Sequence, residues 1–465
     1  MSDAVAQAWV AARREAVVQS LTDYAAIPSV STDPAYAEGI ARAAAWLVQH
    51  LTEAGLEHAG IRPTAGHPVV TADWLHAPDA PTLLIYGHYD VQPPDPLDKW
   101  HSPPFTPTLR DGRLYARGVS DDKGPVIVAI TALAALLATT GRLPVNVKLL
   151  LEGEEEMGSA HLEPFVTAHA DDLRADFVLS ADGAGWRADL PSITVASRGI
   201  CSLDVTVQGA AKDLHSGRHG GSVANPIAAL ARLLASLHDD SGRVAVAGFY
   251  DRVLALSNSA RADIAALPFD EAAYLASIGA RPGGGEAGYS MLERNWVRPS
   301  LEFNGIGGGY QGTGGKTVIP ASAFAKISCR LVPDQDPHEI LKLIAAHLHA
   351  HCPPGVTLSA APHPGVSQPY AIPEDHPGLV LAQQILADLH GQRVLPVRMG
   401  ATVPIGEIFA RCLGIDTVFF SFATSDEDYH APNEFFRLSS LWRGIDAWIA
   451  YLCRVPATRR RAGPA

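Results

Sequence analysis

The segment Leu83–Pro94, L-L-I-Y-G-H-Y-D-V-Q-P-P, decides the fold that we expect for this chain. Its first four residues are an apolar run typical of a short strand buried on both faces, and the run ends at Gly87. His88 and Asp90 follow at once. Ligands of open α/β sheets bind beyond the carboxyl ends of the strands, so this pair predicts a metal ligand and a carboxylate that orients it. Taken alone, the pair is more typical of a hydrogen-bonded loop, or of a pair that only supports other ligands, than of a metal site.

Three further apolar runs predict strands of the same kind, and they are Val145–Leu151, Phe177–Ser180 and Asp416–Ala423. Acidic residues or a histidine follow each run. A pair of aspartates also stands before the apolar helix expected at Val126–Ala138. Because the carboxyl ends of parallel strands meet at one edge of a sheet, we expect these side chains to gather there. The candidates are His88, Asp121, Glu155, Glu156, Asp182 and His430.

The chemistry of this candidate set predicts a centre with two metal ions. Imidazole and carboxylate ligands without cysteine suit zinc, cobalt or manganese. Six candidates exceed the four ligands of one tetrahedral zinc ion, so two ions that share a bridging carboxylate fit the count better. Two structural alternatives remain open: Asp121 could cap the helix that follows it, and Glu154–Glu156 could be a solvated acidic loop.

A different pattern lies between the third and fourth of these strands. Cys201–Gln208 alternates between apolar and polar residues, as a half-exposed antiparallel strand does. Asn225-Pro226 is a helix-capping pair. The remaining expected elements are a helix at Ile227–Leu237, a strand at Phe324–Leu331, a helix at Ile340–His351 and a glycine-rich insertion of weaker pattern at Ala245–Gly315. This order predicts an inserted α+β domain.

The bulk composition is that of a globular protein. The chain has 465 residues, of which 47% are hydrophobic and 18% charged, enough for two to four domains. The formal net charge of −13 disfavours a nucleic-acid or anionic-membrane partner, because like charges repel over long range. A small-molecule substrate fits this composition better.

Localisation and redox state are expected from the first residues and the cysteines. Met1–Gln19 is helix-like and has charges where a signal peptide needs an apolar core, and no uncharged stretch of about 18 apolar residues occurs. We therefore expect a soluble, cytoplasmic protein. The five cysteines form no C-x-x-C pair and suit reduced thiols. A thiol hydrolase, sensitive to alkylation and indifferent to chelators, is the corresponding alternative.

Six motifs and a late histidine occur in the order seen in the co-catalytic di-zinc metallopeptidases and deacylases, the family of cytosolic non-specific dipeptidase, carnosinase and glutamate carboxypeptidase. They are G-H-Y-D-V-Q-P at 87–93, R-G-V-S-D-D-K-G-P at 117–125, E-G-E-E-E-M-G-S at 152–159, D-L-H-S-G at 213–217, T-V-I-P at 317–320, C-R-L-V-P at 329–333 and His430. The chain resembles this family over nearly its whole length, and it is most similar to the dipeptidase and carnosinase branch.

The resemblance implies two divalent metal ions per chain, with Zn²⁺ first and Mn²⁺ or Co²⁺ as alternatives. It implies the following ligands: His88 and Asp182 for one ion, Glu156 and His430 for the other, and Asp121 as the bridge between them.

The resemblance also implies the residues that act on the proton and hold the ligands. Glu155 would be the general base, which takes a proton from the metal-bridging water and later passes it to the leaving amine. Asp90 would orient His88. The peptide bond between Asp121 and Asp122 would be cis.

Substrate recognition is implied by the same family. The inserted domain would form the contact of a homodimer, and His215 would reach into the partner's active site to hold the developing oxyanion. Arg330 would pair with the free carboxylate of the substrate, and Thr402 in the loop 398–402 would assist. This loop has Ala401 where the family pattern has a second glycine.

We therefore expect an α/β protein whose catalytic domain has a mostly parallel central sheet flanked by helices, with an inserted α+β lid and dimerisation domain. The expected boundaries are 1–198 and 362–465 for the catalytic domain and 199–361 for the insert. The expected activity is hydrolysis of dipeptides or short peptides with a free C-terminal carboxylate.

Two other functions remain open for this sequence. One is an N-acyl-amino-acid deacylase of the same fold, which needs the same metals and the same carboxylate clamp. The other is a non-catalytic binding protein that keeps the fold, which the presence of Glu155 and all five expected ligands argues against.

Overall fold

The computed structural model describes residues 2–455, and Met1 and residues 456–465 lie outside the described part. The chain forms two compact units. Unit 1 comprises residues 1–195, 372–397 and 408–465, and unit 2 comprises residues 196–371 and 398–407. The segment expected as an insert, 199–361, lies within unit 2, which also includes the loop 398–407. Unit 1 is formed by segments that precede and follow residues 196–371 in the sequence.

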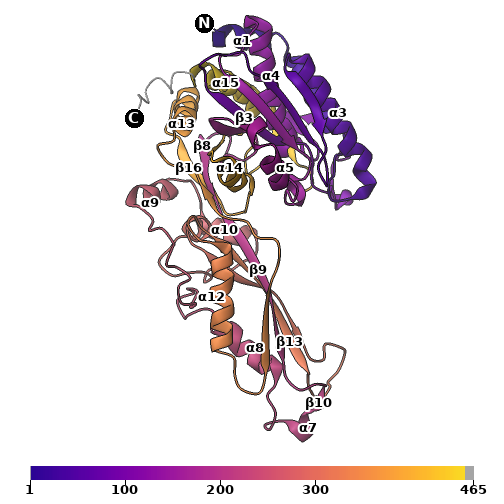
Figure 1. Cartoon of the computed structure of the whole chain (residues 1–465), viewed down its shortest axis with the longest axis vertical. Coiled ribbons are helices and arrows are strands. Elements are labelled where there is room, and N and C mark those ends of the chain that lie inside the picture. Colours follow the sequence, from indigo (N-terminus) through magenta and orange to yellow (C-terminus); the bar gives the residue numbers. More distant parts are fainter. Residues whose placement is uncertain (1, 456–465) are drawn as a thin grey trace. The chain divides into compact units, whose positions relative to one another are not determined.

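Unit 1, whose strand β3 is labelled in Figure 1, is built on a six-stranded sheet with the strand order β1-β2-β6-β3-β7-β17. β6, β3, β7 and β17 run parallel, and β2 is antiparallel to both of its neighbours. The prediction of a mostly parallel central sheet is confirmed. The strands are β1 (Glu57–Arg62), β2 (Val69–Trp74), β3 (Thr82–His88), β6 (Asn146–Glu152), β7 (Phe177–Ser180) and β17 (Thr417–Phe419).

Helices and short sheets complete unit 1. The helices are α1 (Ser2–Ala11), α2 (Arg14–Ala25), α3 (Ala37–Glu53), α4 (Gly124–Thr140), α5 (Leu162–Ala168), α6 (Ala170–Leu173), α13 (Pro377–His390) and α15 (Leu438–Arg454), and α14 (Ile405–Leu413) begins at the end of the loop 398–407. One short sheet of unit 1 has the order β18-β5-β4. A second short sheet has the order β15-β8-β16, and it includes residues that belong to unit 2, namely all of β15 and the last two residues of β8 and of β16. Their strands are β4 (Thr108–Arg110), β5 (Arg113–Tyr115), β18 (Phe435–Arg437), β8 (Ser192–Ser197), β15 (Tyr370–Ala371) and β16 (Leu395–Met399).

α4 is the buried helix of unit 1. Pro125 lies in its first turn, where its fixed φ suits a helix start, and Gly141 ends it in the left-handed conformation. The helix packs on α15 and α1. Among the described residues, the stretch Val119–Thr140 is the one helical segment long and apolar enough to cross a membrane, and 67% of its 18-residue window is buried inside the protein. Such burial is typical of a core helix.

Unit 2 contains a four-stranded antiparallel sheet with the order β11-β13-β9-β14. Its strands are β9 (Gly199–Gln208), β11 (Ser300–Gly308), β13 (Ser322–Leu331) and β14 (Thr357–Pro362). α8 (Pro226–Ala235) and α12 (Pro337–Ala350) pack on one face (Figure 1). Along β13, alternate residues are buried under these helices, whereas Phe324 and Lys326 are exposed. The expected α+β arrangement of this segment is observed.

The remaining elements of unit 2 are short. They are the two-stranded sheet of β10 (Leu214–His215) and β12 (Val318–Ile319), and the helices α7 (Ser216–His219), α9 (Asn258–Ala265), α10 (Glu271–Ser277) and α11 (Met291–Trp296). The glycine-rich insertion expected at 245–315 therefore contains three helices, and its last part forms the edge strand β11. The weak pattern of β11 follows from its exposure and from a register irregularity between Phe303 and Gly305.

Candidate metal centre

His88 is the last residue of β3 and is fully buried. Its ring Nδ1 lies 3.0 Å from the backbone carbonyl of Asp90 and 3.4 Å from the Asp90 carboxylate, so the Nε2 atom is left for a ligand. Gly87 precedes it because a Cβ atom there would lie 2.8 Å from a carboxylate oxygen of Asp122. The missing side chain thus lets Asp122 accept a hydrogen bond from the His88 amide.

Asp90 connects the end of β3 to the acidic turn that follows β6. Its two carboxylate oxygens accept hydrogen bonds from the backbone amides of Glu155 and Glu156, at 3.2 and 3.1 Å. The Gln92 side-chain amide donates to the Glu156 carboxylate at 2.8 Å. One carboxylate therefore contacts the expected ligand His88 and also fixes the backbone that carries Glu155 and Glu156.

Asp121 lies between the two histidines. Its Oδ1 is 3.0 Å from His88 Nε2, and its Oδ2 is 3.0 Å from His430 Nε2. The residue belongs to a π-helical turn, η3 (Val119–Lys123), but has the extended angles φ −125° and ψ 91°. The expected cis peptide bond between Asp121 and Asp122 is confirmed. Asp121 thus presents one oxygen to each histidine, which a helix-capping aspartate would not do.

Two groups of potential ligands share Asp121. One consists of His88, Asp121 and Asp182, and the other of Asp121, Glu156 and His430, and within each group the ligand atoms lie within 4.8 Å of one another. His430 Nε2 is also 3.1 Å from a Glu156 oxygen. Neutral imidazole and carboxylate oxygen are donors that Zn²⁺, Mn²⁺ and Co²⁺ accept, so the residues present fit a pair of divalent ions.

Charge is concentrated in this cluster. Burial and the neighbouring charge of Asp121 raise the pKa of Glu156 to about 7, and burial raises the pKa of Asp182 to about 6 although His88 opposes it. Hydrogen bonds to Asp121 and Glu156 raise the pKa of His430 to about 10. Burial also raises the pKa of Glu155 well above its usual range. The cluster attracts positive charge, so divalent cations that bind there would displace protons.

Glu434 is a buried residue that the sequence patterns did not single out. Its carboxylate accepts hydrogen bonds from the Arg117 side chain at 2.7 Å and from the backbone amides of Gly118 and Ser120 at 2.7 and 2.9 Å. A longer bond of 3.2 Å comes from the amide of Asp121. Glu434 therefore fixes the backbone on which the shared aspartate stands.

Glu427 has a matching role on the other side of His430. Its buried carboxylate accepts from the Ser120 hydroxyl at 2.7 Å and from the Arg437 side chain at 3.0 Å. The loop between Glu427 and Glu434 carries His430, which has a φ of 62° in the left-handed region. Nothing in the spacing of these glutamates distinguishes them from solvated acids, so sequence reasoning had no signal for them.

The three expected substrate-binding residues all belong to unit 2, and they are Arg330, Thr402 and His215. Arg330 lies near the end of β13, and its Nη1 donates to the Thr402 hydroxyl at 2.7 Å. His215 is exposed at the end of β10, and its Nδ1 accepts a hydrogen bond from the Gly217 amide at 3.0 Å. Because Nδ1 is the acceptor, neutral His215 carries its proton on Nε2.

Known proteins resemble the chain over most of its length. The model of "Peptidase family M20/M25/M40" matches residues 84–454. The Beta-Ala-His dipeptidase of Mus musculus is 32% identical over 376 residues, which cover 79% of this chain and 75% of that protein. The Cys-Gly metallodipeptidase dug1 of Schizosaccharomyces pombe is 28% identical and covers 95% of both chains. The crystal structure of the M20 family metallo-carboxypeptidase Sso-CP2 from Sulfolobus solfataricus has a TM-score of 0.80, with 32% identity over 95% of this chain and 99% of that one.

The first prediction concerns Glu434. Glu434→Gln removes the charge that holds Arg117 and the backbone before Asp121, so metal affinity should fall by about 10- to 100-fold. Competition with a chromophoric chelator measures the affinity, and thermal unfolding shows that the variant is folded. Glu163→Gln is the control, because Glu163 is a half-exposed carboxylate of the same unit paired with Arg411. Unchanged metal affinity of the Glu434 variant would refute this role.

The second prediction concerns the pH dependence of the metal-free protein. The pKa of His430 is about 10 in the folded chain and about 6.5 when unfolded, so its contribution to stability is complete below pH 6.5 and disappears as the pH rises through 10. The melting temperature in chelator should therefore fall between pH 7 and 10, and His430→Ala should reduce this fall. His101→Ala, which changes an exposed histidine, should leave it unchanged. Equal pH profiles of the wild type and His430→Ala would contradict the assignment.

Proposed function

Because the chain belongs to peptidase family M20/M25/M40 and is a hydrolase of peptide bonds, we propose that it is a two-metal exopeptidase that cleaves dipeptides or short peptides with a free C-terminal carboxylate. The observation that carries this proposal is the pair of ligand groups that share Asp121, with Glu155 next to the ligand Glu156. The names of the relatives, a Beta-Ala-His dipeptidase and a Cys-Gly metallodipeptidase, support dipeptides as substrates.

In the proposed centre His88 and Asp182 would hold one ion, Glu156 and His430 would hold the other, and Asp121 would be shared by both. The donor set favours Zn²⁺, with Mn²⁺ or Co²⁺ as substitutes. When bound, two divalent ions polarise the scissile carbonyl and make the attacking water more acidic.

Glu155 moves the proton in this proposal. A carboxylate oxygen of Glu155 accepts a proton from the attacking water as the C–O bond forms, and it then delivers this proton to the nitrogen of the leaving amine as the peptide C–N bond breaks. The hydrogen bond from its backbone amide to Asp90 supports this role, because it fixes the turn on which Glu155 stands. Asp90 contacts His88 as well, so the same carboxylate positions the base and a ligand.

Arg330 recognises the free C-terminal carboxylate in this proposal. A guanidinium group offers two parallel donors to a carboxylate, which explains an exopeptidase without a long substrate groove. The hydrogen bond from Arg330 to Thr402 supports the role of the loop 398–402 as its partner. An N-acyl-amino-acid deacylase would use the same clamp, so the amine side of the substrate separates the two activities.

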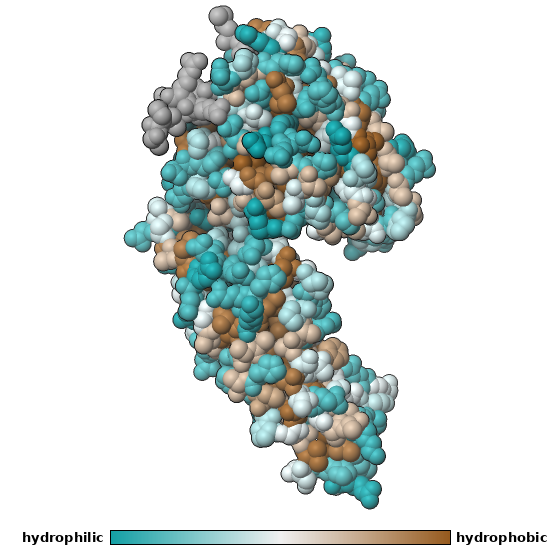
Figure 2. All heavy atoms as spheres, viewed as in Figure 1, coloured by the Kyte–Doolittle hydropathy of each residue, from teal (hydrophilic) through white to brown (hydrophobic). Residues whose placement is uncertain are grey.

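We propose that the enzyme is a cytoplasmic homodimer in which unit 2 is the lid and the dimerisation domain. Exposed apolar side chains of unit 2 support a protein contact there, and they are Ile227, Ile306, Tyr310 and Phe324. Figure 2 shows apolar patches between polar atoms on the visible face of this unit. His215 of one protomer would donate its Nε2 proton to the oxyanion in the site of the other. All five cysteines are free thiols, which supports a reducing compartment.

The third prediction tests the catalytic assignment. The wild type should hydrolyse an unblocked dipeptide faster than N-acetyl or N-succinyl amino acids, lose activity in chelator and regain it with Zn²⁺ or Mn²⁺. Glu155→Gln should lower kcat by about 100- to 10,000-fold and keep the wild-type metal content, because Glu155 moves protons and binds no ion. Elemental analysis together with steady-state kinetics measures both effects.

Glu163→Gln is the control for this experiment, since it removes a carboxylate of unit 1 that is paired with Arg411 on the surface. Loss of metal in Glu155→Gln would make Glu155 a ligand. Full metal loading without cleavage of any dipeptide would favour the deacylase.

The fourth prediction tests the role of His215 across the dimer. His215→Ala and Glu155→Gln should each be inactive alone. After subunit exchange of equal amounts, roughly a quarter of the wild-type activity should return, because half of the dimers are mixed and each has one intact site. His219→Ala, in the helix α7 that follows His215, is the control, and it should stay active. Absence of recovery in a mixture whose exchange is proven by mass spectrometry would remove the cross-subunit role.

A further inference from the structure

Arg198 is a buried arginine of unit 2 that no step of the proposed reaction uses. It stands directly before β9 and is 7% exposed. Its Nε donates to the carbonyl of Gly400 at 2.7 Å, and its backbone amide donates to the carbonyl of Ala401 at 3.2 Å. The terminal nitrogens of the guanidinium have no acceptor among the described residues, since Gly400 is the only one that the side chain reaches.

The neighbouring charge that acts most strongly on Arg198 is that of another arginine. Burial and the charge of Arg330 lower the pKa of Arg198 to about 10, while Glu302 acts in the opposite direction. Arg330 itself bonds to Thr402, two residues beyond Gly400, so one short loop touches both guanidinium groups. Within residues 2–455, neither arginine forms an ion pair with a carboxylate. A buried cation beside a half-buried one, with neutral hydrogen-bond partners only, is unfavourable unless an anion binds to them.

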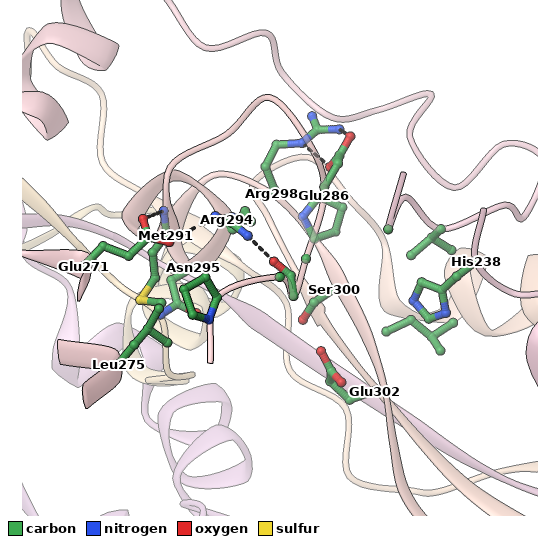
Figure 3. A pocket seen from close by; sticks show the side chains of 18 of the residues that line it. His238, Glu271, Leu275, Glu286, Met291, Arg294, Asn295, Arg298, Ser300 and Glu302 are labelled. Carbon is green, nitrogen blue, oxygen red and sulfur yellow. Dashed lines mark hydrogen bonds and ion pairs between the residues drawn. The ribbon is translucent and has the colours of Figure 1, made fainter. Parts of the chain in front are cut away.

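An open cavity makes Arg198 accessible despite its burial. Arg198 and Ser300 line a cavity of about 560 Å³ in unit 2, and Ser300 is the cross-strand neighbour of Arg330. Half-buried Arg298 of this cavity is already neutralised, because it forms two bonds of 2.8 Å with Glu286 (Figure 3). Among the arginines of the cavity wall, Arg198 is thus the buried one whose terminal guanidinium nitrogens have no acceptor in the described part of the chain.

We propose that Arg198 is a second carboxylate-binding residue, which together with Arg330 forms a two-guanidinium site for the C-terminal carboxylate of the substrate. One carboxylate oxygen accepts from the Nη atoms of Arg198 and the other from Arg330, so the substrate supplies the anion that both cations lack. The cavity beside Arg198 gives the side chain of the C-terminal residue room to extend. This inference rests on the proposed exopeptidase function, in which a free carboxylate is the recognised group.

The test compares one dipeptide with its C-terminal amide in the full-length, metal-loaded enzyme. Arg198→Gln should lower kcat/KM for the free dipeptide by about 10- to 100-fold, which is the effect of losing a charged hydrogen bond, mostly through KM. Cleavage of the amide should change by less than about threefold, since the amide has no charge for Arg198 to bind. The ratio of the two kcat/KM values is therefore the readout.

Arg281→Gln is the matched control, because Arg281 lines the same cavity but is exposed, and its ratio should stay at the wild-type value. The double variant with Arg330→Gln should lose less than the product of the two single effects, because both arginines bind one carboxylate. Multiplicative losses would mean separate roles and would overturn the proposal.

A structural role of Arg198 gives a different result. If Arg198 only holds the loop at Gly400, Arg198→Gln lowers cleavage of the dipeptide and of the amide by the same factor, and the proposal is refuted. If Arg198→Gln does not fold, Arg198→Lys replaces it, and a free-to-amide ratio equal to that of the wild type refutes the proposal in the same way. A wild type that cleaves neither substrate would instead refute the proposed exopeptidase function.

Discussion

The attraction of Asp121 for both histidines is the interaction on which the rest of the site depends. Each of its two oxygens lies 3.0 Å from an imidazole nitrogen, one of His88 and one of His430. The histidines come from segments more than 300 residues apart, as the numbering shows. Asp121 contacts both from an extended backbone conformation inside a helical turn. The other carboxylates of the two ligand groups lie around Asp121, and divalent cations bound there would offset their mutual repulsion.

Buried carboxylates outside the ligand set provide the rigidity that this arrangement needs. Glu427 and Glu434 flank His430 in sequence, and both accept hydrogen bonds from the short segment that ends at Asp121. These hydrogen bonds connect the loop that contains His430 to the segment that contains Asp121. His430 has a left-handed backbone, a conformation that costs on the order of 1–3 kcal/mol for a non-glycine residue. The surrounding hydrogen bonds offset that cost, so the position of His430 is set by the loop and not by its local preference.

The sequence predicted the parts of this structure that depend on apolar patterning and strand ends. β3, β6 and β7 lie where their apolar runs predict them, and the side chains that follow these strands meet at one edge of the sheet. Parallel strands make this outcome predictable, because they share a direction. Glu427 and Glu434 could not be predicted, since a buried acid that bonds to backbone amides has no spacing of its own. β11 was missed for a related reason: it is an exposed edge strand with a register irregularity, so few of its residues alternate.

Opposite charges are divided between the two units, and this division has a consequence for recognition. Unit 1 holds the acidic cluster around Asp121, and unit 2 holds the unpaired cations Arg198 and Arg330. Both arginines stand at the ends of strands of one sheet, and the loop 400–402 contacts each of them, so their spacing is fixed by backbone geometry. A guanidinium held by a backbone carbonyl or a threonine hydroxyl keeps its charge available, whereas one paired with a carboxylate, like Arg298, does not. Among residues 2–455 no carboxylate forms an ion pair with either arginine, and this makes that part of unit 2 suited to an anionic group. Half-buried Arg298 is already paired with Glu286, so it does not offer the same property elsewhere in the cavity.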